Sequence, residues 1–477
     1  MIQQTAEEAI ERLTEFRQKL YESFGILPDA TMELLDSLSS NEHASSPVEL
    51  SENSLFQRSH GSVYQAIRGC YGSNEEERAK ILSAQRIALG SVLPLPSLRS
   101  HVVFVIDVTP CFRPDGETVS DRGWIYKGGG QVEAGHNYSI LGYVPELPQP
   151  HSWCVPLSIE RVPFSENKEQ FGIEQAIVWA SDKNLPFHKQ LVVLLGDRAY
   201  ISKQCLHRVW QQKNLVIVTR FRNNQVVYQQ PEPKDEGEKE KGHPRWFGDP
   251  FRLNGSETWT EPSETYSFEQ LNKRGQTERV EVKAWSNLLM RGKRKPEVIP
   301  MHERPFTLVQ VTTYRANGNK KFKNPLWLTA FGQRQDELSA KEIVDDYFER
   351  PNIEHFNRFG KQDLLLTAFS TSNTFHEENW AHLVGLSYAQ LFLAQPLCTI
   401  LPKPWQKHLP QFKYDHIPFT PAMVQQDFAR IIQQIGTPAK APKPRGNSPG
   451  RPQGSTKPPR PRKKVLRKSK KKKKQKK

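Results

Sequence analysis

Cysteine and long apolar runs are both scarce in this chain of 477 residues. The five cysteines are scattered, odd in number and never in a C-x-x-C spacing, which argues against a disulfide framework and favours a reducing compartment. No uninterrupted apolar run reaches 18 residues, and the first residues lack the charged-then-apolar pattern of a signal sequence. We therefore expect a soluble, cytoplasmic protein that does not contact a membrane.

Acidic residues are absent from residues 440–477, which contain 18 Lys or Arg. The whole chain has 67 basic and 52 acidic residues, so removing those 18 leaves 49 basic against 52 acidic residues in the first 439. The formal net charge of +15 therefore comes from the end of the chain, and the body is close to neutral. Any nucleic-acid-binding function of the body must be argued from its motifs.

The apolar content is sufficient for a folded protein. Hydrophobic residues make up 36 % of the chain and include 10 Trp and 24 Phe, which supports a substantial core and two to four domains. Residues 1–95 carry apolar side chains at the i, i+3, i+4 spacing of helices. We therefore expect residues 1–95 to form a helical region.

Two apolar runs are each followed by an aspartate. Residues 101–106 precede Asp107, and residues 191–195 precede Asp197 with one glycine between. Such runs are typical of buried strands, and we expect each to present its aspartate at its carboxyl end. Either aspartate alone could instead be a turn or capping residue. Around them we expect strands at 123–126, 138–144, 153–157 and 215–219, and helices at 169–182 and 201–213.

The stretch from Tyr347 to Lys361 places a Tyr, an Arg, a Glu and a Lys at successive offsets of three, four and seven. These offsets return side chains to one helical face, which would project an aromatic ring, a carboxylate and two cations together. An ordinary surface helix with Glu/Arg pairs is the alternative. Because Pro351 interrupts the pattern, we expect one helix at 339–349 and a second that begins at Pro351 and holds Glu354 in its first turn.

Tyr347-x2-Arg350-x3-Glu354-x6-Lys361 resembles the signature of the YREK class of DDE transposases, insertion-sequence family four. The resemblance implies an α/β, RNase H-like core with a mixed sheet, in which Asp107, Asp197 and Glu354 are the catalytic residues. It implies that these three carboxylates bind two Mg²⁺ or Mn²⁺ ions, since hard oxygen ligands suit those metals. The Asp-x-x-Tyr sequence that begins at Asp197 also resembles the second-acid motif of that class.

The same resemblance implies how DNA is held. Arg350 and Lys361 would bind backbone phosphates beside the scissile bond, and Tyr347 would contact the same strand. Trp327 resembles an aromatic residue that contacts a flipped base in related enzymes, with a core tryptophan as the equal alternative. Arg451 lies in a Gly-Arg-Pro sequence that resembles an AT-hook, and the surrounding basic tail would bind phosphates without sequence preference or simply remain solvated.

The length between Asp197 and Glu354 predicts a β-rich insertion in the core. The predicted layout is a helical N-terminal region (1–95), the first part of the core (96–221), the insertion (222–325), the second part of the core (326–401), a covering segment (402–436) and a disordered basic tail (437–477).

The resemblance implies a DDE transposase that cleaves DNA at transposon ends and transfers the strand into target DNA. It also implies that the helical region 1–95 binds DNA ends, with a plain scaffold as the equal alternative. The expected partners are double-stranded DNA, as terminal inverted repeats and as target, and a second copy of the chain in a DNA-bound homodimer. The expected location is the nucleoid in the bacterial cytoplasm. An RNase H-like nuclease without strand transfer, or an inactive DNA-binding descendant of a transposase, are the alternatives.

Overall fold

The structure is a computed structural model, and it describes residues 5–147, 150–232, 245–272, 275–292, 298–399, 404–405, 408, 419–444, 450 and 452–456. Arg451, most of the predicted tail and much of the predicted covering segment lie outside the described residues. The predicted boundaries of the domains remain predictions.

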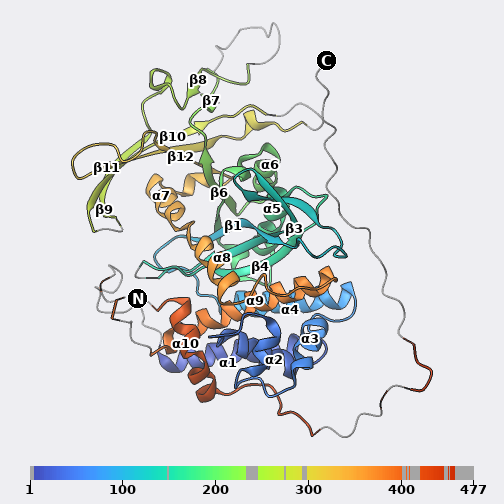
Figure 1. Cartoon of the computed structure of the whole chain (residues 1–477). Coiled ribbons are helices and arrows are strands. Elements are labelled where there is room, and N and C mark those ends of the chain that lie inside the picture. The colour runs from blue at the N-terminus through green and yellow to red at the C-terminus, as the bar shows by residue number, and fades with distance from the viewer. Residues whose placement is uncertain are drawn as a thin grey trace.

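One mixed sheet of ten strands runs through the centre of the protein (Figure 1). Its strands lie in the order β2-β3-β1-β5-β6-β12-β11-β10-β9, with β4 paired to β3. The bounds are β1 (His101–Phe112), β2 (Gly123–Gly128), β3 (Gln131–Val144), β4 (Val155–Val162), β5 (Leu191–Leu195), β6 (Leu215–Phe221), β9 (Glu264–Leu271), β10 (Thr277–Leu288), β11 (Phe306–Arg315) and β12 (Leu326–Phe331). A separate pair consists of β7 (Val226–Tyr228) and β8 (Pro250–Arg252).

The mixed α/β fold predicted from the sequence is confirmed. Strand β1 pairs antiparallel with β3 and parallel with β5, and β5 pairs parallel with β6. Every residue of β5 is buried, as expected for a parallel strand covered on both faces. Three antiparallel strands followed by parallel ones, in the order β4-β3-β1-β5-β6, are consistent with an RNase H-like core.

The expectation that Asp107 ends its strand is wrong. Strand β1 continues to Phe112, because β3 remains paired with it as far as the contact between Phe112 and Gly135. Only the parallel partner stops earlier, at Leu195, which pairs with Val105. Asp107 therefore lies in the middle of a strand but just beyond the end of its parallel neighbour.

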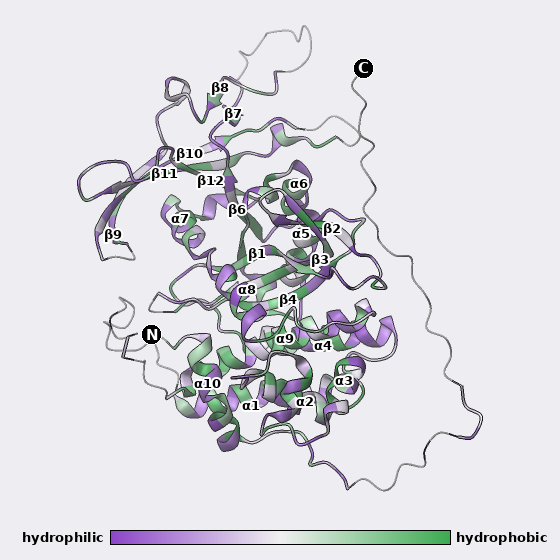
Figure 2. Ribbon diagram, viewed as in Figure 1, coloured by the Kyte–Doolittle hydropathy of each residue, from purple (hydrophilic) through white to green (hydrophobic). Residues whose placement is uncertain are grey.

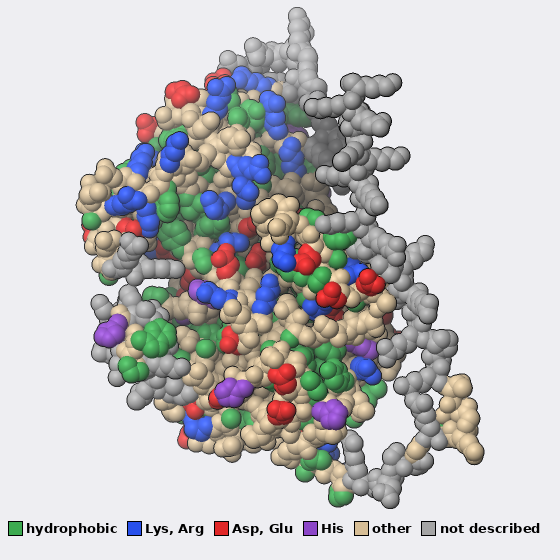
Figure 3. Space-filling model, in the orientation of Figure 1, with side chains coloured by type: hydrophobic (Ala, Val, Ile, Leu, Met, Phe, Trp, Pro, Cys, Tyr) green, Lys and Arg blue, Asp and Glu red, His purple; other side chains and the backbone are tan. Residues whose placement is uncertain are grey.

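The described part of segment 222–325 contains strands β7 to β11 and adds to the central sheet. Strand β10 pairs with β9 and β11, β11 pairs with β12, and β12 pairs with β6 of the core. The segment thus widens the sheet. Lys and Arg side chains gather on the visible face of this half of the molecule, above the core (Figure 3).

A long helix, α9 (Thr374–Ala394), is buried on nearly all sides and packs against β4. A helix that is apolar all round belongs in a core, and Figure 2 draws α9 largely green. The helices packed below the sheet with it are α1 (Ala6–Ser23), α2 (Pro28–Ser39), α3 (His60–Gly69), α4 (Glu75–Val92) and α10 (Pro421–Ile435). Among the described residues, no helix is both long enough and apolar enough to cross a bilayer.

Buried polar contacts join the N-terminal helices to α9. The Arg17 guanidinium of α1 donates to Gln390 Oε1 at 2.6 Å, and Asn379 Nδ2 donates to the carbonyl of Ile67 at 2.8 Å. Because these helices share a core with α9, their packing supports the scaffold alternative for residues 1–95. DNA binding by this region remains a prediction.

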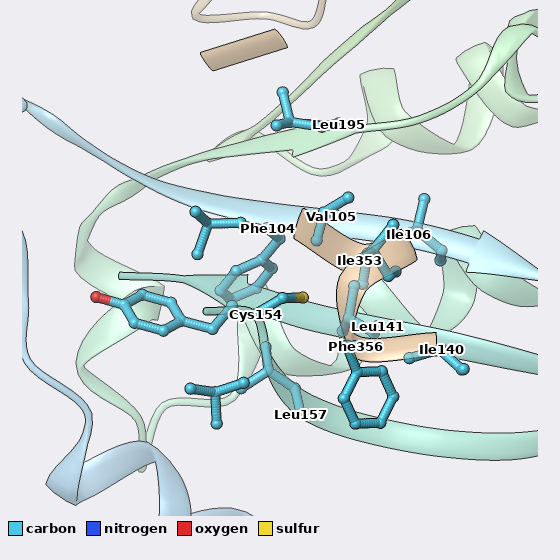
Figure 4. Packing of buried hydrophobic residues seen from close by; sticks show 14 of the residues in the cluster. Phe104, Val105, Ile106, Ile140, Leu141, Cys154, Leu157, Leu195, Ile353 and Phe356 are labelled. Atoms are coloured by element: carbon cyan, nitrogen blue, oxygen red, sulfur yellow. The ribbon is translucent and has the colours of Figure 1, made fainter. Parts of the chain in front are cut away.

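The predicted helix break at Pro351 is confirmed. Helix α7 (Ala340–Glu349) ends at the capping residue Arg350, and α8 (Asn352–Gln362) begins one residue after the proline. The side chains of Ile353 and Phe356 hold α8 against the sheet, where they face the apolar side chains of β1 and β3 (Figure 4). Helices α5 (Lys168–Ser181) and α6 (Lys203–Gln211) also pack on the core strands.

A buried ionic cluster joins β1, β3 and α9. The Glu377 carboxylate on α9 accepts a hydrogen bond from Arg113 at 2.7 Å and lies 2.9 Å from His136 Nδ1. Arg113 also donates to the carbonyls of Thr367 and Phe369. Burial acts to raise the pKa of Glu377, but the His136 hydrogen bond and the Arg113 charge outweigh it and lower the pKa. The carboxylate is thus the charged partner that Arg113 needs.

Glu377→Gln should lower the free energy of unfolding by about 3–5 kcal/mol, because it leaves the buried Arg113 cation uncompensated. Urea unfolding followed by circular dichroism measures the change. The control is Glu76→Gln, which removes an exposed partner of Lys80 and should have little effect. Equal stability of the two variants would contradict a stabilising role for the cluster.

Candidate active site

The parallel pairing of β1 with β5 brings two of the predicted acids to neighbouring positions. Val105 pairs with Leu195, and this is the last pair between the two strands. Asp107 and Asp197 each follow that pair by two residues, so they lie at the same level beyond the end of β5. Because neighbouring strands are about 4.8 Å apart, this register places the start of both side chains at one edge.

Asp107 is a half-buried carboxylate with partners on α7 and α8. Asn357 Nδ2 donates to its Oδ2 at 3.2 Å, and Arg350 Nη2 lies 3.9 Å from its Oδ1. Burial raises the pKa of Asp107, the Arg350 charge opposes this, and the charges of Asp197 and Glu354 raise the pKa further. The other two predicted acids therefore lie close enough for their charge to act on Asp107.

Asp197 combines a capping role with a place at the site. Its Oδ1 accepts a hydrogen bond from the Ala199 amide at 2.8 Å and caps a short 3₁₀ helix, Arg198–Ile201. The Thr219 hydroxyl, on the neighbouring strand β6, donates to its backbone carbonyl at 2.6 Å. These two contacts fix Asp197 at the end of β5. The alternative of a capping residue is thus correct for one carboxylate oxygen.

Glu354 projects from the first turn of α8, as the sequence predicted. Arg350 Nη1 lies 3.1 Å from Glu354 Oε1, and the Glu354 side chain is 59 % exposed. Since Arg350 also approaches Asp107, one guanidinium links the acid on β1 with the acid on α8.

Tyr347 and Lys361 both lie near charged residues of this group. Burial raises the pKa of Tyr347, and the nearby charges of Arg350 and Arg220 oppose the shift. Burial lowers the pKa of Lys361, and the nearby Cys111 and Asp107 oppose that shift. All four residues of the Tyr/Arg/Glu/Lys pattern therefore lie near Asp107 or Asp197. The pattern also contains an ion pair of its own, between Arg350 and Glu354.

Trp327 lies in an aromatic cluster on β12. Its side chain is 1 % exposed and its ring centroid is 5.4 Å from that of Trp259 and 5.7 Å from that of Trp285. This packing favours the alternative of a core tryptophan. Contact with a flipped base remains a prediction, and it would require the cluster to open.

The oxygen ligands at the site suit a hard divalent cation, but the Arg350 guanidinium already contacts two of the three carboxylates. Asp107 and the two carboxylates whose charges act on it are oxygen ligands of the kind that Mg²⁺ and Mn²⁺ prefer. Within the described part of the chain, no three His, Cys, Asp or Glu side chains are grouped closely enough to hold an ion. The Arg350 guanidinium supplies positive charge to two of the three acids instead.

Two features of the site could not be found with the sequence motif. Asn357 follows Glu354 by one helical turn and donates to Asp107, and only the helical spacing from Glu354 hints at it. Arg220 and Arg222 lie at and just after the end of β6, beside Asp197 and Tyr347. The Arg-x-Arg spacing of these two residues is visible in the sequence. Their position next to the acids depends on the order of the strands in the sheet.

Arg350→Met should tighten the binding of Mn²⁺ by about fivefold, because the guanidinium and the cation compete for the same carboxylates and each partly exposed pair contributes roughly 0.5 kcal/mol. Electron paramagnetic resonance of free Mn²⁺ measures the affinity. Arg334→Met, which breaks a pair with Glu337 elsewhere and removes the same charge, should leave the affinity unchanged. Identical affinities in both variants would argue against competition at this site.

A family model described as DDE superfamily endonuclease matches residues 19–288. No curated protein sequence matches the chain. The matched residues include Asp107 and Asp197, end before Glu354, and span more than half of the 477 residues. The mixed sheet, with Asp107 and Asp197 just beyond the last parallel pair of β1 and β5, agrees with that match. The chain therefore belongs to the DDE superfamily endonuclease family.

Proposed function

We propose that this protein is a DDE transposase of the YREK class, insertion-sequence family four, which cleaves DNA at transposon ends and joins the freed strand to target DNA. The observation that carries the proposal is the register of β1 and β5, which places Asp107 and Asp197 side by side within reach of the Glu354 charge. Family membership supports DNA cleavage, and the Tyr/Arg/Glu/Lys pattern supports the finer assignment.

In this proposal Asp107, Asp197 and Glu354 hold two Mg²⁺ or Mn²⁺ ions. Bound ions of this kind activate the attacking oxygen and stabilise the leaving oxygen of a phosphodiester. The chain contributes the placement of the ligands. Asn357 fixes Asp107, the Ala199 amide fixes Asp197, and the buried face of α8 fixes the backbone of Glu354.

The basic residues of the site would hold the DNA strand. Arg350 would leave the carboxylates and bind a phosphate as cations take its place, since guanidinium groups form paired hydrogen bonds with phosphate oxygens. Lys361 lies beside Asp107 and would bind a second phosphate, and Tyr347 would contact the same strand. These contacts position the strand without reading its sequence.

The proposed reaction has two steps on double-stranded DNA. Water first frees a 3′ end at the terminal inverted repeat, and the new 3′ hydroxyl then attacks the target. We propose that a homodimer pairs the two ends and that the protein acts at the bacterial nucleoid in the cytoplasm. A nuclease without strand transfer and an inactive DNA-binding protein are the outcomes that the experiments below would reveal.

Asp107→Asn, Asp197→Asn and Glu354→Gln should each lower metal-dependent nicking of terminal-repeat DNA by about 100- to 1,000-fold, as expected when one charge-stabilising group is lost. Single-turnover cleavage with Mg²⁺ measures the rate. Asp345→Asn, an exposed acid of α7 paired with Lys341, is the matched control and should cleave normally. Normal cleavage by all three site variants would reject the proposed site, and no cleavage by the unaltered protein would favour the inactive alternative.

Precleaved terminal-repeat DNA with a free 3′ hydroxyl should be joined to supercoiled plasmid by the unaltered protein and not by Glu354→Gln. The reason is that both steps use the same three carboxylates. Gel analysis of plasmid products detects the joining. Cleavage without joining would support the nuclease alternative.

Removal of residues 445–477 should weaken binding to unrelated duplex DNA and make it less sensitive to salt, because fewer counterions are released from the phosphates. Fluorescence anisotropy between low and high salt measures the slope. A tail of equal length with Gln in place of each Lys and Arg is the control and should behave like the deletion. An unchanged slope would mean that the tail is only a solvated segment.

A further inference from the structure

Two neighbouring hollows lie where helix α4 packs beside the core, and none of the proposed catalytic acids lines them. The inner hollow has a volume of about 170 Å³ and is lined by α4, β4, α5 and α9. The outer hollow has a volume of about 600 Å³ and is lined mainly by α5 and the turn that precedes it. Arg86, Glu160 and Trp179 line both hollows, so the two share one wall. We refer to the two hollows together as the Glu160 site.

Two carboxylates of the Glu160 site have no cation beside them. Glu160 and Glu166 form no ion pair with any residue that the structure describes, whereas the third lining acid, Glu174, pairs with Arg208 at 2.6 Å. Burial raises the pKa of Glu160, so its negative charge is poorly stabilised in the free protein. A positively charged ligand would supply the counterion that both carboxylates lack.

The positive groups near the Glu160 site already have partners or are neutral. Arg86 is the one Lys or Arg among the described lining residues, and it pairs with Asp182 at 2.9 Å. His382 lines the inner hollow, and burial together with the charge of Arg78 lowers its pKa to about 3. Arg78 itself pairs with Glu378 at 3.2 Å. The described wall therefore favours a cation over an anion.

Each hollow also has a buried oxygen atom that lacks a hydrogen-bond partner. Tyr71 lines the inner hollow and is 0 % exposed, and Gln175 lines the outer hollow and is 5 % exposed. The Tyr71 hydroxyl and Gln175 Oε1 have no partner among the described residues. A buried polar atom without a partner is costly, so its occurrence calls for an explanation. Both oxygens can accept a hydrogen bond, and an ammonium group offers three donors.

The size and lining of the site narrow the choice of cation. The inner hollow is close in volume to a cavity of about 150 Å³ that holds one benzene ring, so it suits a short carbon chain. Leu82, Leu157 and Trp179 provide apolar surface for methylene groups. One unpaired carboxylate lies in the shared wall and the other in the outer hollow, which suits two ammonium groups on one chain.

We infer that the Glu160 site binds an aliphatic diamine or a longer polyamine, with one ammonium group at Glu160 and a second at Glu166. The inference goes beyond the proposed catalytic function and does not depend on it. The ligand would lie between α4 and β4, which are neighbours below the sheet (Figure 1). Its binding would stabilise the packing of the N-terminal helices on the core.

The test is isothermal titration calorimetry with the full-length chain and no DNA, so its outcome is independent of whether the chain cleaves DNA. The probes are putrescine, butylamine and 1,4-butanediol, which have two, one and no ammonium groups on the same four carbons. Butylamine should bind at least about tenfold more weakly than putrescine, as expected when one hydrogen bond between charged groups is lost. Butanediol should not bind. Absence of putrescine binding, equal binding of butanediol, or displacement of putrescine by an equal concentration of Mg²⁺ would each overturn the inference.

Glu160→Gln should weaken putrescine binding at least about tenfold, because it removes the carboxylate charge and retains the shape. The variant should fold, since burial already favours the neutral acid that glutamine resembles. The matched control is Asp363→Asn, another half-buried acid whose pKa burial raises and which lies outside both hollows. Equal putrescine affinity of the two variants would refute the assignment.

Glu166→Gln should abolish the preference for putrescine over butylamine, because the second ammonium group loses its counterion. An unchanged preference would overturn the assignment of a diamine.

Tyr71→Phe should weaken putrescine binding about threefold, as for one neutral hydrogen bond, without lowering the melting temperature of the free protein. The reason is that the hydroxyl has no described partner to lose. Putrescine should also raise the melting temperature of the unaltered chain but not that of Glu160→Gln, because a ligand stabilises only the state that binds it. A lower melting temperature of Tyr71→Phe with unchanged putrescine affinity would overturn the part of Tyr71 in the site, and an equal rise in Glu160→Gln would overturn binding at Glu160.

Discussion

The contact of Arg350 with both Asp107 and Glu354 is the interaction on which the site depends. Like charges brought to one edge of a sheet repel one another, and the raised pKa of Asp107 records both its burial and that repulsion. The positive charge of Arg350, which contacts both Asp107 and Glu354, offsets part of this repulsion in the free protein. The residue that provides it, Arg350, is the C-cap of α7 and precedes Pro351 at the junction with α8. A cation at such a junction lowers the electrostatic cost of holding Asp107 and Glu354 near one another.

The remainder of the fold keeps that junction in place. On the α7 side, Asp346 lies 2.8 Å from the buried His101 at the start of β1, and Glu349 accepts a hydrogen bond from Arg99 at 2.8 Å. On the α8 side, Phe356 packs edge-on against Tyr388 of α9, with ring centroids 5.0 Å apart. Both helices are therefore tied to elements that do not move independently of the sheet. The N-terminal helices pack around α9. They therefore help to place the acids indirectly, because α9 supports α8.

Features that depend on neighbouring residues in the chain could be predicted from the sequence. Features that depend on pairing between distant strands could not. The break at Pro351 follows from the missing amide of one residue, so the sequence alone predicted it. The mid-strand position of Asp107 depends on β3, which pairs with β1 beyond the point where β5 ends. The burial of Trp327 likewise depends on Trp259 and Trp285, from a segment that the sequence suggested was a separate insertion. Residues whose role comes from a neighbouring strand leave no mark in a motif.

The charges of residues 1–439 nearly cancel in sum but are unevenly distributed over the protein. The first 439 residues are nearly neutral in sum, and many arginines are paired with carboxylates, as Arg17 is with Asp36. Against that background, Arg198, Arg220 and Arg222, which form no ion pair with a described residue, lie together beside Asp197 and are a local excess of positive charge. This excess lowers the stability of the free protein, because the guanidinium groups repel one another. The buried donors Arg350 Nε and Trp327 Nε1, which have no acceptor among the described residues, lower it further. Arg350 belongs both to this group of arginines and to the acids, so its one positive charge is shared between Asp107 and Glu354 while it adds to the repulsion among the arginines.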